Sequence, residues 1–326
     1  MEMGVVVRPF GPDAIVRPYI GGTQTIAKIS YSAPHLSSTS VPASISWGNR
    51  RDAPKPLRRR AKQVFPAADG QRMNLTLEKY EMLSPRCEVE HAGTRMTFLT
   101  PNVFTKWRVD SIYTKEPCTL EWIASFEPDE ILADIGANVG MYTIWAAATR
   151  SARVFAFEPE AQNYATLNRN ILVNRLQHKV KAYCLGLTDK TGLTMLHMAD
   201  LRIGASCHSV GEALDYQHKP LRTEFEQGCV SFRLDDLIAS QAIPIPHHIK
   251  IDVDGFEPKV IAGARETIAN PAVRSILVEL NLNLADHKAM VPEIEAFGFR
   301  HDPEQVRRAA RKDGPFKGLA EHVFRR

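Results

Sequence analysis

One stretch of the sequence places an acid and two glycines at a spacing that suits ligand binding. Asp134 ends a run of apolar residues, and Gly136 and Gly140 follow it before the alanine-rich segment 141–148. Glycine lets the backbone bend sharply and approach a ligand closely, because it has no Cβ. We therefore expect a buried strand, a tight turn and the start of a helix, with Asn138 capping that helix.

A helix that starts at such a turn points its free N–H groups toward the ligand, which is typical of nucleotide sites. The spacing matches neither G-x-G-x-x-G nor G-x-x-x-x-G-K-[ST], the motifs of dinucleotide and nucleoside triphosphate sites. Asp134 would also repel a pyrophosphate, whereas it would attract a ligand with an ammonium or sulfonium group. On this stretch alone, an ordinary strand-to-helix connection is the alternative.

A second acid follows at the distance where nucleotide-binding βαβ units bind a ribose. The short apolar segment 153–158 ends in Glu158, and Pro159 comes next. In βαβ folds an acid about 20 residues past the glycine turn accepts hydrogen bonds from ribose hydroxyls. A lone acid at a strand end more often begins a helix, but its spacing from Asp134 favours a ligand. Together these motifs resemble the S-adenosylmethionine site of class I methyltransferases.

Further motifs narrow the resemblance to one family. The segment 250–257 reads K-I-D-V-D-G-F-E and is followed by an apolar helical pattern. The segments that carry the resemblance are 134–140, 157–159, 234–237, 248–264 and 277–281. From about Phe98 onward the chain resembles the FkbM family of methyltransferases. The family usually has K-I-D-V-E-G-x-E, so Asp254 replaces a glutamate here.

The resemblance implies a doubly wound, mostly parallel α/β sheet of the seven-stranded, Rossmann-like type. It also implies a cofactor site for S-adenosylmethionine built from Asp134, Gly136, Asn138, Gly140 and Glu158. Among these residues, Asp134 would favour the ammonium and Glu158 would bind the ribose. The resemblance adds Glu116 and Ser206 as neighbours of the cofactor, although helix stabilisation and a plain surface loop are equally open for them.

Catalytic residues are expected near the fourth strand, which lies beside the first in the resembled fold. Methyl transfer is a direct displacement, so alignment of the reactants at about 3 Å supplies much of the catalysis. An alcohol must also lose its proton, and Asp252 is the expected base or acceptor anchor, unless it only orders its loop. Lys250, Asp254 and Glu257 are further expected site residues. The carboxylate oxygens of Asp252, Asp254 and Glu257 could suit Mg²⁺, but the spacing is weak evidence and we assign no metal.

Periodicity divides the chain into three parts. Residues 1–70 are rich in Pro, Ser and Arg, and we expect a disordered basic extension. Residues 71–126 are expected to form a small N-terminal β/α lead-in packed on the core, and residues 127–326 the S-adenosylmethionine-binding domain. A polar insertion at 211–228 could form an acceptor lid. The expected strands of the main sheet are 131–134, 153–158, 180–187, 249–253, 275–281, 298–301 and 321–325, with the last two antiparallel.

Composition limits the function classes. The 44% hydrophobic content suits a soluble globular protein with a sizeable core. The net charge is +4, but residues 1–70 carry ten Lys/Arg against four Asp/Glu, so the remainder is slightly acidic and a nucleic-acid partner is not indicated. The five cysteines form no C-x-x-C pair, which favours a reducing cytoplasm over a disulfide framework. We expect neither a membrane span nor a signal peptide.

The sequence thus predicts S-adenosylmethionine-dependent O-methylation of a hydroxyl on a sugar, a polysaccharide or a secondary metabolite. The preference for oxygen comes from the resemblance alone. Methylation of nucleic acid or of another nitrogen is one alternative, weakened by the absence of [DNS]-P-P-[YFW] at the fourth strand. A non-catalytic S-adenosylmethionine-binding protein is another, which the change at Asp254 keeps open. The expected partner is a small-molecule or glycan acceptor, and the enzyme could form a homo-oligomer.

Overall fold

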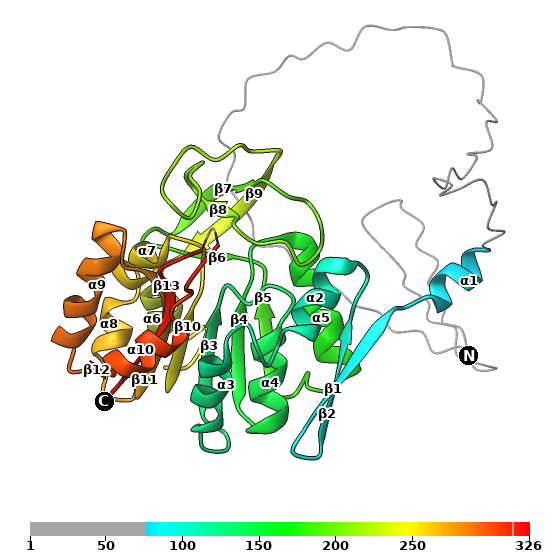
Figure 1. The fold of residues 1–326 in the computed structure, drawn as a ribbon, viewed down its shortest axis with the longest axis horizontal. Helices are drawn as coiled ribbons and strands as arrows, with labels where there is room; N and C mark the ends of the chain where they lie inside the picture. Colours follow the sequence, from blue (N-terminus) through cyan, green and yellow to red (C-terminus); the bar gives the residue numbers. More distant parts are fainter. Residues whose placement is uncertain (1–75, 315) are drawn as a thin grey trace, which may run out of the picture. The chain divides into compact units, whose positions relative to one another are not determined.

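The fold is organised around one sheet, whose strands extend across Figure 1 from β12 on the left to β5 on the right. Its strands are β3 (Ile131–Ile135), β4 (Arg153–Phe157), β5 (Val180–Tyr183), β10 (His248–Ile251), β11 (Ser275–Asn281), β12 (Arg300–His301) and β13 (Leu319–Arg325). The seven strands lie in the order β12-β13-β11-β10-β3-β4-β5. All pairs from β11 to β5 are parallel, and β13 is antiparallel to both of its neighbours. The predicted doubly wound sheet and its antiparallel final pair are confirmed.

This computed structural model describes residues 76–314 and 316–326. The prediction of a disordered extension at 1–70 lies outside the described residues. Arg72–Arg326 forms one compact unit. Across the described ranges, no helix has both the length and the apolar character needed to cross a membrane.

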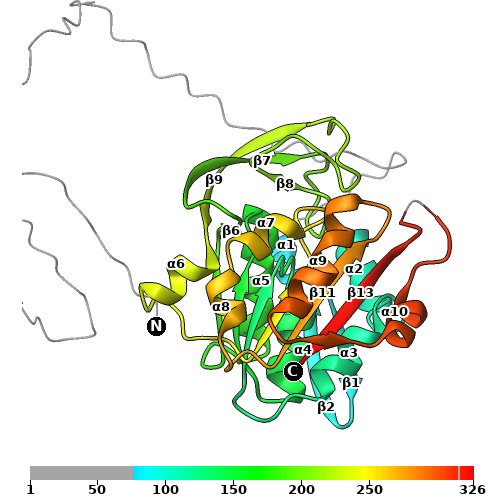
Figure 2. The same ribbon diagram turned by 90° about the vertical axis from the view of Figure 1, so that its left-hand side faces the viewer.

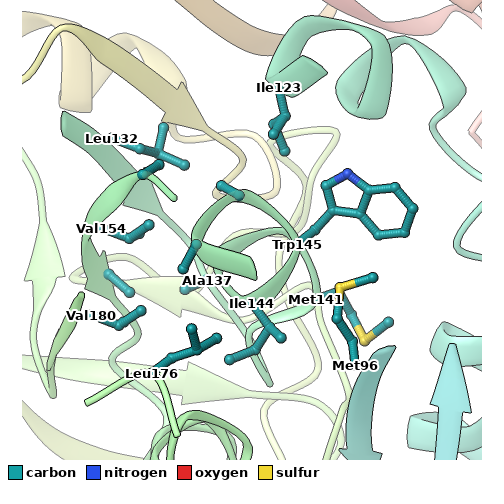
Figure 3. Packing of buried hydrophobic residues seen from close by; sticks show 14 of the residues in the cluster. Met96, Ile123, Leu132, Ala137, Met141, Ile144, Trp145, Val154, Leu176 and Val180 are labelled. Atoms are coloured by element: carbon teal, nitrogen blue, oxygen red, sulfur yellow. The ribbon is translucent and has the colours of Figure 1, made fainter. Parts of the chain in front are cut away.

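Helices cover both faces of the sheet because the side chains of each strand alternate between them. On β3, Leu132 belongs to the apolar cluster of one face, whereas Ile131 and Ala133 belong to that of the other. The first face carries α3 (Pro117–Ala124), α4 (Met141–Thr149) and α5 (Ala161–Val173); the second carries α6 (Leu234–Ala239), α7 (Glu257–Ala262), α8 (Arg265–Ala269) and α9 (Ala285–Ala296). Figure 3 shows the first cluster, with Ile144 and Trp145 of α4 among residues from the strands.

The segment before the sheet contains α1 (Leu77–Met82), β1 (Arg86–His91), β2 (Thr94–Leu99) and α2 (Val103–Asp110). β1 and β2 form an antiparallel hairpin. Its inner residues Met96 and Phe98 are fully buried in the cluster of the first face. Asn170 of α5 and Asn174, which directly follows this helix, accept hydrogen bonds from the N–H groups of Leu99 and Thr97, both at 2.8 Å. These two side-chain amides therefore take the place of a neighbouring strand beside β2.

A second sheet stands beyond one end of the first (Figures 1 and 2). It contains β6 (Gly186–Leu187), β7 (Gly192–Met198), β8 (Ser209–Val210) and β9 (Phe225–Phe232), in the order β6-β9-β7-β8. The predicted strand at 180–187 is divided, because β5 stays in the large sheet and β6 joins the small one. Part of the polar insertion at 211–228 belongs to β9, and the remainder forms a loop.

The outer edge of β13 is covered by a side chain. β12 pairs with β13 only at Arg325 and Phe324. Farther along, Gln305 of α10 (Pro303–Ala309) donates to the carbonyl oxygen of Glu321 at 2.9 Å and accepts from the N–H of Val323 at 3.1 Å. One glutamine amide thus pairs with β13 as a strand would.

Candidate active site

A cavity of about 300 Å³ opens at the carboxyl ends of the parallel strands. Gly136, Glu158 and Asp252 line it directly after β3, β4 and β10, and Glu279 lines it from β11. Doubly wound sheets bind ligands at this edge. The volume lies at the lower end of the range for small-molecule sites.

The turn after β3 brings its backbone against the end of β10. Gly136 has a φ of 79°, and a Cβ on it would lie 1.8 Å from the carbonyl oxygen of Asp252. Only glycine fits this position without a shift of backbone. Gly140 has a φ of 86° and is not part of the cavity wall; its Cβ would lie 2.4 Å from Cδ1 of Leu167 on α5. One glycine therefore shapes the cavity, and the other lets α5 pack closely.

The predicted helix cap at Asn138 is wrong. Gly140 is the residue that precedes α4, and Asn138 has a φ of 50°, whereas an N-cap residue normally has an extended backbone. The Asn138 side chain donates to the carbonyl oxygen of Ala205 at 2.8 Å and accepts from the N–H of Val139 at 2.9 Å. Asn138 lines the cavity and ties the loop at 202–208 to the glycine turn.

Asp134 and Lys250 are register partners on β3 and β10 and lie beneath the cavity, outside its wall. Each is 1% exposed. Nζ of Lys250 lies 3.9 Å from Oδ1 of Asp134 and 3.0 Å from Oδ2 of Asp252. Thr143 donates to the second oxygen of Asp134. Lys250 therefore orients Asp252 by an ion pair, and the charge of Asp134 stabilises the Lys250 ammonium from the side away from the cavity.

Glu158 lies in the cavity wall with both carboxylate oxygens held in place. Oε2 accepts from the N–H of Asn138 at 2.8 Å, and Oε1 accepts from the N–H of Glu160 at 2.9 Å. Burial raises the pKa of Glu158 to about 7, against the lowering effect of these two bonds. Each oxygen keeps a lone pair that can accept from a ligand hydroxyl.

Three carboxylates meet on the β10–β11 side of the cavity. Oxygens of Asp252, Asp254 and Glu279 lie within 4.8 Å of one another. Asp254 accepts from the N–H of Cys207 at 2.7 Å, and Glu279 pairs with Arg311. The loop at 202–208 is therefore bound to the β10 side as well as to the glycine turn.

The cavity carboxylates differ in proton affinity. Burial alone would raise the pKa of Asp252, but the charges of Lys250 and Lys115 outweigh it and hold that pKa well below its usual range. Burial and repulsion from Asp252 raise the pKa of Glu279 well above its usual value, although Arg311 opposes this shift. Asp252 is thus a weak base, and Glu279 is a stronger one.

A family model described as the methyltransferase FkbM domain matches residues 134–301. The chain belongs to the FkbM family. It is therefore a methyltransferase, as the sequence predicts. The matched range begins at Asp134 and includes Glu158, Asp252 and Glu279, so the cavity walls formed by β3, β4, β10 and β11 lie within it.

Individual relatives of this FkbM-family enzyme are distant. Hexuronic acid methyltransferase AglP of Haloferax volcanii is 26% identical over 192 residues, which cover 59% of this chain and 73% of that protein. The 31-O-demethyl-FK506 methyltransferase FkbM of Streptomyces tacrolimicus is 26% identical over 190 residues, covering 50% and 70%. The solved structure of methyltransferase FkbM from Methylobacillus flagellatus KT has a TM-score of 0.40 and 16% identity; the match covers 62% of this chain and 44% of that one.

Glu257 of this FkbM-family enzyme lies outside the cavity wall that we predicted it to line. It begins α7, and its carboxylate accepts from the N–H groups of Val253 and Gly255, at 3.0 and 3.1 Å. Nε2 of His287 lies 3.5 Å away from it. Burial raises the pKa of Glu257 to about 8. Glu257 therefore orders the loop after β10, and it affects the cavity only through the position of that loop.

Glu116 and Ser206, which the family resemblance implies as neighbours of the cofactor, differ in their position relative to the cavity. Ser206 lies in the cavity wall, whereas Glu116 lies beneath it and is 1% exposed. Glu116 pairs with Lys115 and lies 3.7 Å from Arg311, and both of these cations line the cavity. Glu116 therefore acts on the cavity through its neighbours.

Several cavity residues went unnoticed in the sequence. They are Trp107, Arg108, Lys115, Glu279 and Arg311. Glu279 lies in a segment that carries the family resemblance, so its place at a strand end was an available signal. Arg311 follows α10, far along the chain from the other walls, and has no local pattern that marks it.

Two candidate sets for a divalent cation include Glu279 of the cavity wall, namely Asp252–Asp254–Glu279 and Glu116–Glu279–Glu321. In the first set, Glu279 stands in place of the Glu257 considered from sequence, and all three carboxylates line the cavity. In that first set, Lys250 already pairs with Asp252 and Arg311 with Glu279. In the second set, Lys115 pairs with Glu116, and Arg311 pairs with Glu279 and Glu321. These side chains supply the positive charge that a metal would bring, and we assign no metal.

Proposed function

We propose that this enzyme takes its methyl group from S-adenosylmethionine and transfers it to a hydroxyl oxygen of a sugar, a polysaccharide or a secondary metabolite. The observation that carries the proposal is the excess of carboxylates at the floor of the cavity. They are Glu116, Asp134, Asp252, Asp254, Glu279 and Glu321, and the cations Lys115, Lys250 and Arg311 pair with some of them. Burial raises the pKa of Asp134, Asp254, Glu279 and Glu321, and a bound cation would favour their ionised form. A cationic ligand would be stabilised there, whereas a polyphosphate would be repelled.

The walls offer matching groups for each part of this cofactor. The turn at Gly136 leaves room for close backbone approach, and Asn138 and Ser206 would hold the methionine part. Glu158 would accept from the ribose hydroxyls. Apolar residues beside it, Leu185, Leu187 and Val210, would surround the adenine. When bound, the cofactor supplies an electrophilic methyl group on a positively charged sulfur.

The acceptor would lie on the β10–β11 side. Asp252, fixed by Lys250, would accept a hydrogen bond from the acceptor hydroxyl and orient its oxygen. Because Lys250 lowers the pKa of Asp252, orientation suits it better than proton removal. Glu279, whose pKa is raised, is better suited to receive the hydroxyl proton. The new oxygen–carbon bond would form as the methyl–sulfur bond breaks, with S-adenosylhomocysteine as the leaving group. This division of labour revises our expectation that Asp252 is the base.

The remaining sequence predictions enter the proposal unchanged. We propose that residues 71–126 act as a lead-in to the methyltransferase domain at 127–326, and that the insertion at 211–228 helps to cover the acceptor. The hexuronic acid named for the Haloferax volcanii relative makes uronic acids and their glycans the first acceptors to test.

Calorimetric titration with S-adenosylmethionine and S-adenosylhomocysteine tests the cofactor. We expect micromolar binding that Glu158→Gln weakens by about tenfold or more, since a charged hydrogen bond contributes about 1.5–3 kcal/mol. Glu121→Gln, on the exposed side of α3, is the matched control and should bind as the wild type does. Absence of binding to the wild type would refute the proposal.

Turnover then tests the acceptor class. Radiolabelled methyl transfer to a panel of uronic acids, neutral glycans, alcohols and single-stranded RNA separates O-methylation from the nucleic-acid alternative. Asp252→Asn should lower kcat by about a hundredfold with cofactor binding retained, because the acceptor oxygen loses its orientation. Binding without turnover on any acceptor would favour a non-catalytic binding protein.

A further inference from the structure

Arg108 of α2 contributes a fixed cationic group to the wall of the cavity. Its Nε donates to the carbonyl oxygen of Gly204 at 2.7 Å. A guanidinium is planar, so a bond at Nε fixes the direction in which its two terminal nitrogens point. The side chain is half-buried, and the neighbouring Trp107 also lines the cavity.

The charge of Arg108 has no acidic partner, unlike that of the other cations in the cavity wall. Lys115 pairs with Glu116, Lys259 with Glu212 at 2.6 Å, and Arg311 with Glu279 and Glu321. In the part of the chain that the structure describes, no carboxylate oxygen lies within 4.0 Å of the Arg108 guanidinium. Its field reaches Asp254 and His208 without an ion pair to either.

The contacts of Gly204 and its neighbours place Arg108 close to the glycine turn. The N–H of Gly204 donates to Asn163 at 2.7 Å, and a Cβ on Gly204 would lie 2.9 Å from Cγ2 of Thr105 on α2. The next residue, Ala205, accepts from Asn138 of the turn at 2.8 Å. Helix α2, the loop and the turn after β3 are therefore joined by consecutive residues.

We propose that Arg108 binds a ligand carboxylate in this cavity. A guanidinium can hold a carboxylate by two parallel N–H···O bonds, and such charged bonds are stronger than neutral ones. Two ligands could bring that carboxylate, namely the methionine part of S-adenosylmethionine and an acidic acceptor such as a uronic acid. The link through Ala205 to Asn138 favours the cofactor. The inference rests on the proposed function and adds to it the group that recognises the amino-acid end of the cofactor.

A pair of ligands that differ by one group tests this assignment. Calorimetry would compare S-adenosylmethionine with decarboxylated S-adenosylmethionine, on the wild type and on Arg108→Gln. We expect the variant to lose about tenfold to hundredfold in affinity for the first ligand and less than about twofold for the second. Arg108→Lys should lie between, because it keeps the charge and loses the two-bond geometry.

Controls separate this result from a loss of folding. Arg95→Gln, an exposed arginine of β2 outside the cavity, should change neither affinity. Retained binding of the decarboxylated ligand shows that the Arg108 variant is folded. Equal weakening of both ligands would overturn the proposal, since Arg108 would then act on the shape of the cavity and not on a carboxylate.

The remaining outcomes are also distinct. If Arg108→Gln leaves both cofactor affinities unchanged but raises KM for a uronic acid and not for its methyl ester, the carboxylate site stands and its ligand is the acceptor. If neither a cofactor affinity nor that KM changes, the site is refuted. If the wild type binds no form of the cofactor, the proposed function itself fails, and this result differs from a failure of Arg108 alone.

Discussion

Nζ of Lys250 lies between the carboxylates of Asp252 and Asp134, 3.0 Å from the first and 3.9 Å from the second. The three residues join the ends of two neighbouring parallel strands. Asp134 is buried, whereas Asp252 reaches the cavity. The buried ion pair with Asp134 thus fixes the Lys250 ammonium, which in turn fixes the Asp252 carboxylate that faces the ligand.

Replacing Lys250 with Met should destabilise the fold strongly, because it leaves buried carboxylates without their cation. Loss of one partner of a buried ion pair costs about 3–5 kcal/mol, to be measured as the change in free energy of unfolding in urea. Lys179→Met removes a surface pair with Asp129 and is the control, for which we expect little change. If both variants had similar free energies of unfolding, the charge of Lys250 would not be needed to stabilise the carboxylates of Asp134 and Asp252.

Gly136→Ala should unfold the turn or abolish cofactor binding, because its Cβ would lie 1.8 Å from the carbonyl oxygen of Asp252. Gly93 offers a matched control, since it has the same φ of 79° and a Cβ on it would meet no atom within 4 Å. Gly93→Ala should cost only the backbone term, about 1–2 kcal/mol. Thermal unfolding of both variants isolates the effect of the close approach. Equal losses would mean that the turn can move away from β10.

Cofactor affinity should depend on pH through Glu158. Its pKa is raised to about 7, and the ionised carboxylate can accept from both ribose hydroxyls. The dissociation constant for S-adenosylhomocysteine should therefore fall as the pH rises through about 7 and level off above it. Calorimetry from about pH 6 to about pH 8.5 measures this change. Glu158→Gln should bind more weakly with a flatter profile; an unchanged profile would assign the titration to another group.

The asparagines of α5 should contribute to stability through the hairpin. Asn170 accepts from the N–H of Leu99 and donates to the carbonyl oxygen of Val139, each at 2.8 Å. Asn170→Ala leaves both backbone groups unpaired, for an expected loss of about 2–4 kcal/mol in the free energy of unfolding. Asn168→Ala, at an exposed position of the same helix, should change it little. Comparable losses would show that helix propensity, and not the hairpin, determines the effect.

Local patterns were sufficient to predict the main sheet. Strands β3, β4 and β11 are short apolar runs bounded by polar residues, and their predicted limits agree closely with the observed ones. The small sheet was harder to predict. β6 and β8 are two residues long each, and such strands form only because β7 and β9 are already paired. Their sequence carries no period that could indicate them.

The site was predicted less completely than the fold, because burial and direction depend on tertiary contacts. Glu257 was expected in the cavity, but the start of α7 turns its carboxylate back toward the N–H groups of the preceding loop. Asn138 was expected as a helix cap, but its left-handed backbone sends its side chain to Ala205. Arg108 and Arg311 reach the cavity from helices and loops outside the motifs, so only the folded chain brings them there.

The hydrogen bonds of Gln305 to β13 have a consequence for self-association. Exposed strand edges invite pairing with another chain, and proteins protect them with charges, bulges or covering segments. Here a single amide satisfies the carbonyl oxygen of Glu321 and the N–H of Val323, so this part of the edge offers no free groups to a second molecule. Loss of that amide would open a template for intermolecular β-pairing, making Gln305 a safeguard against aggregation.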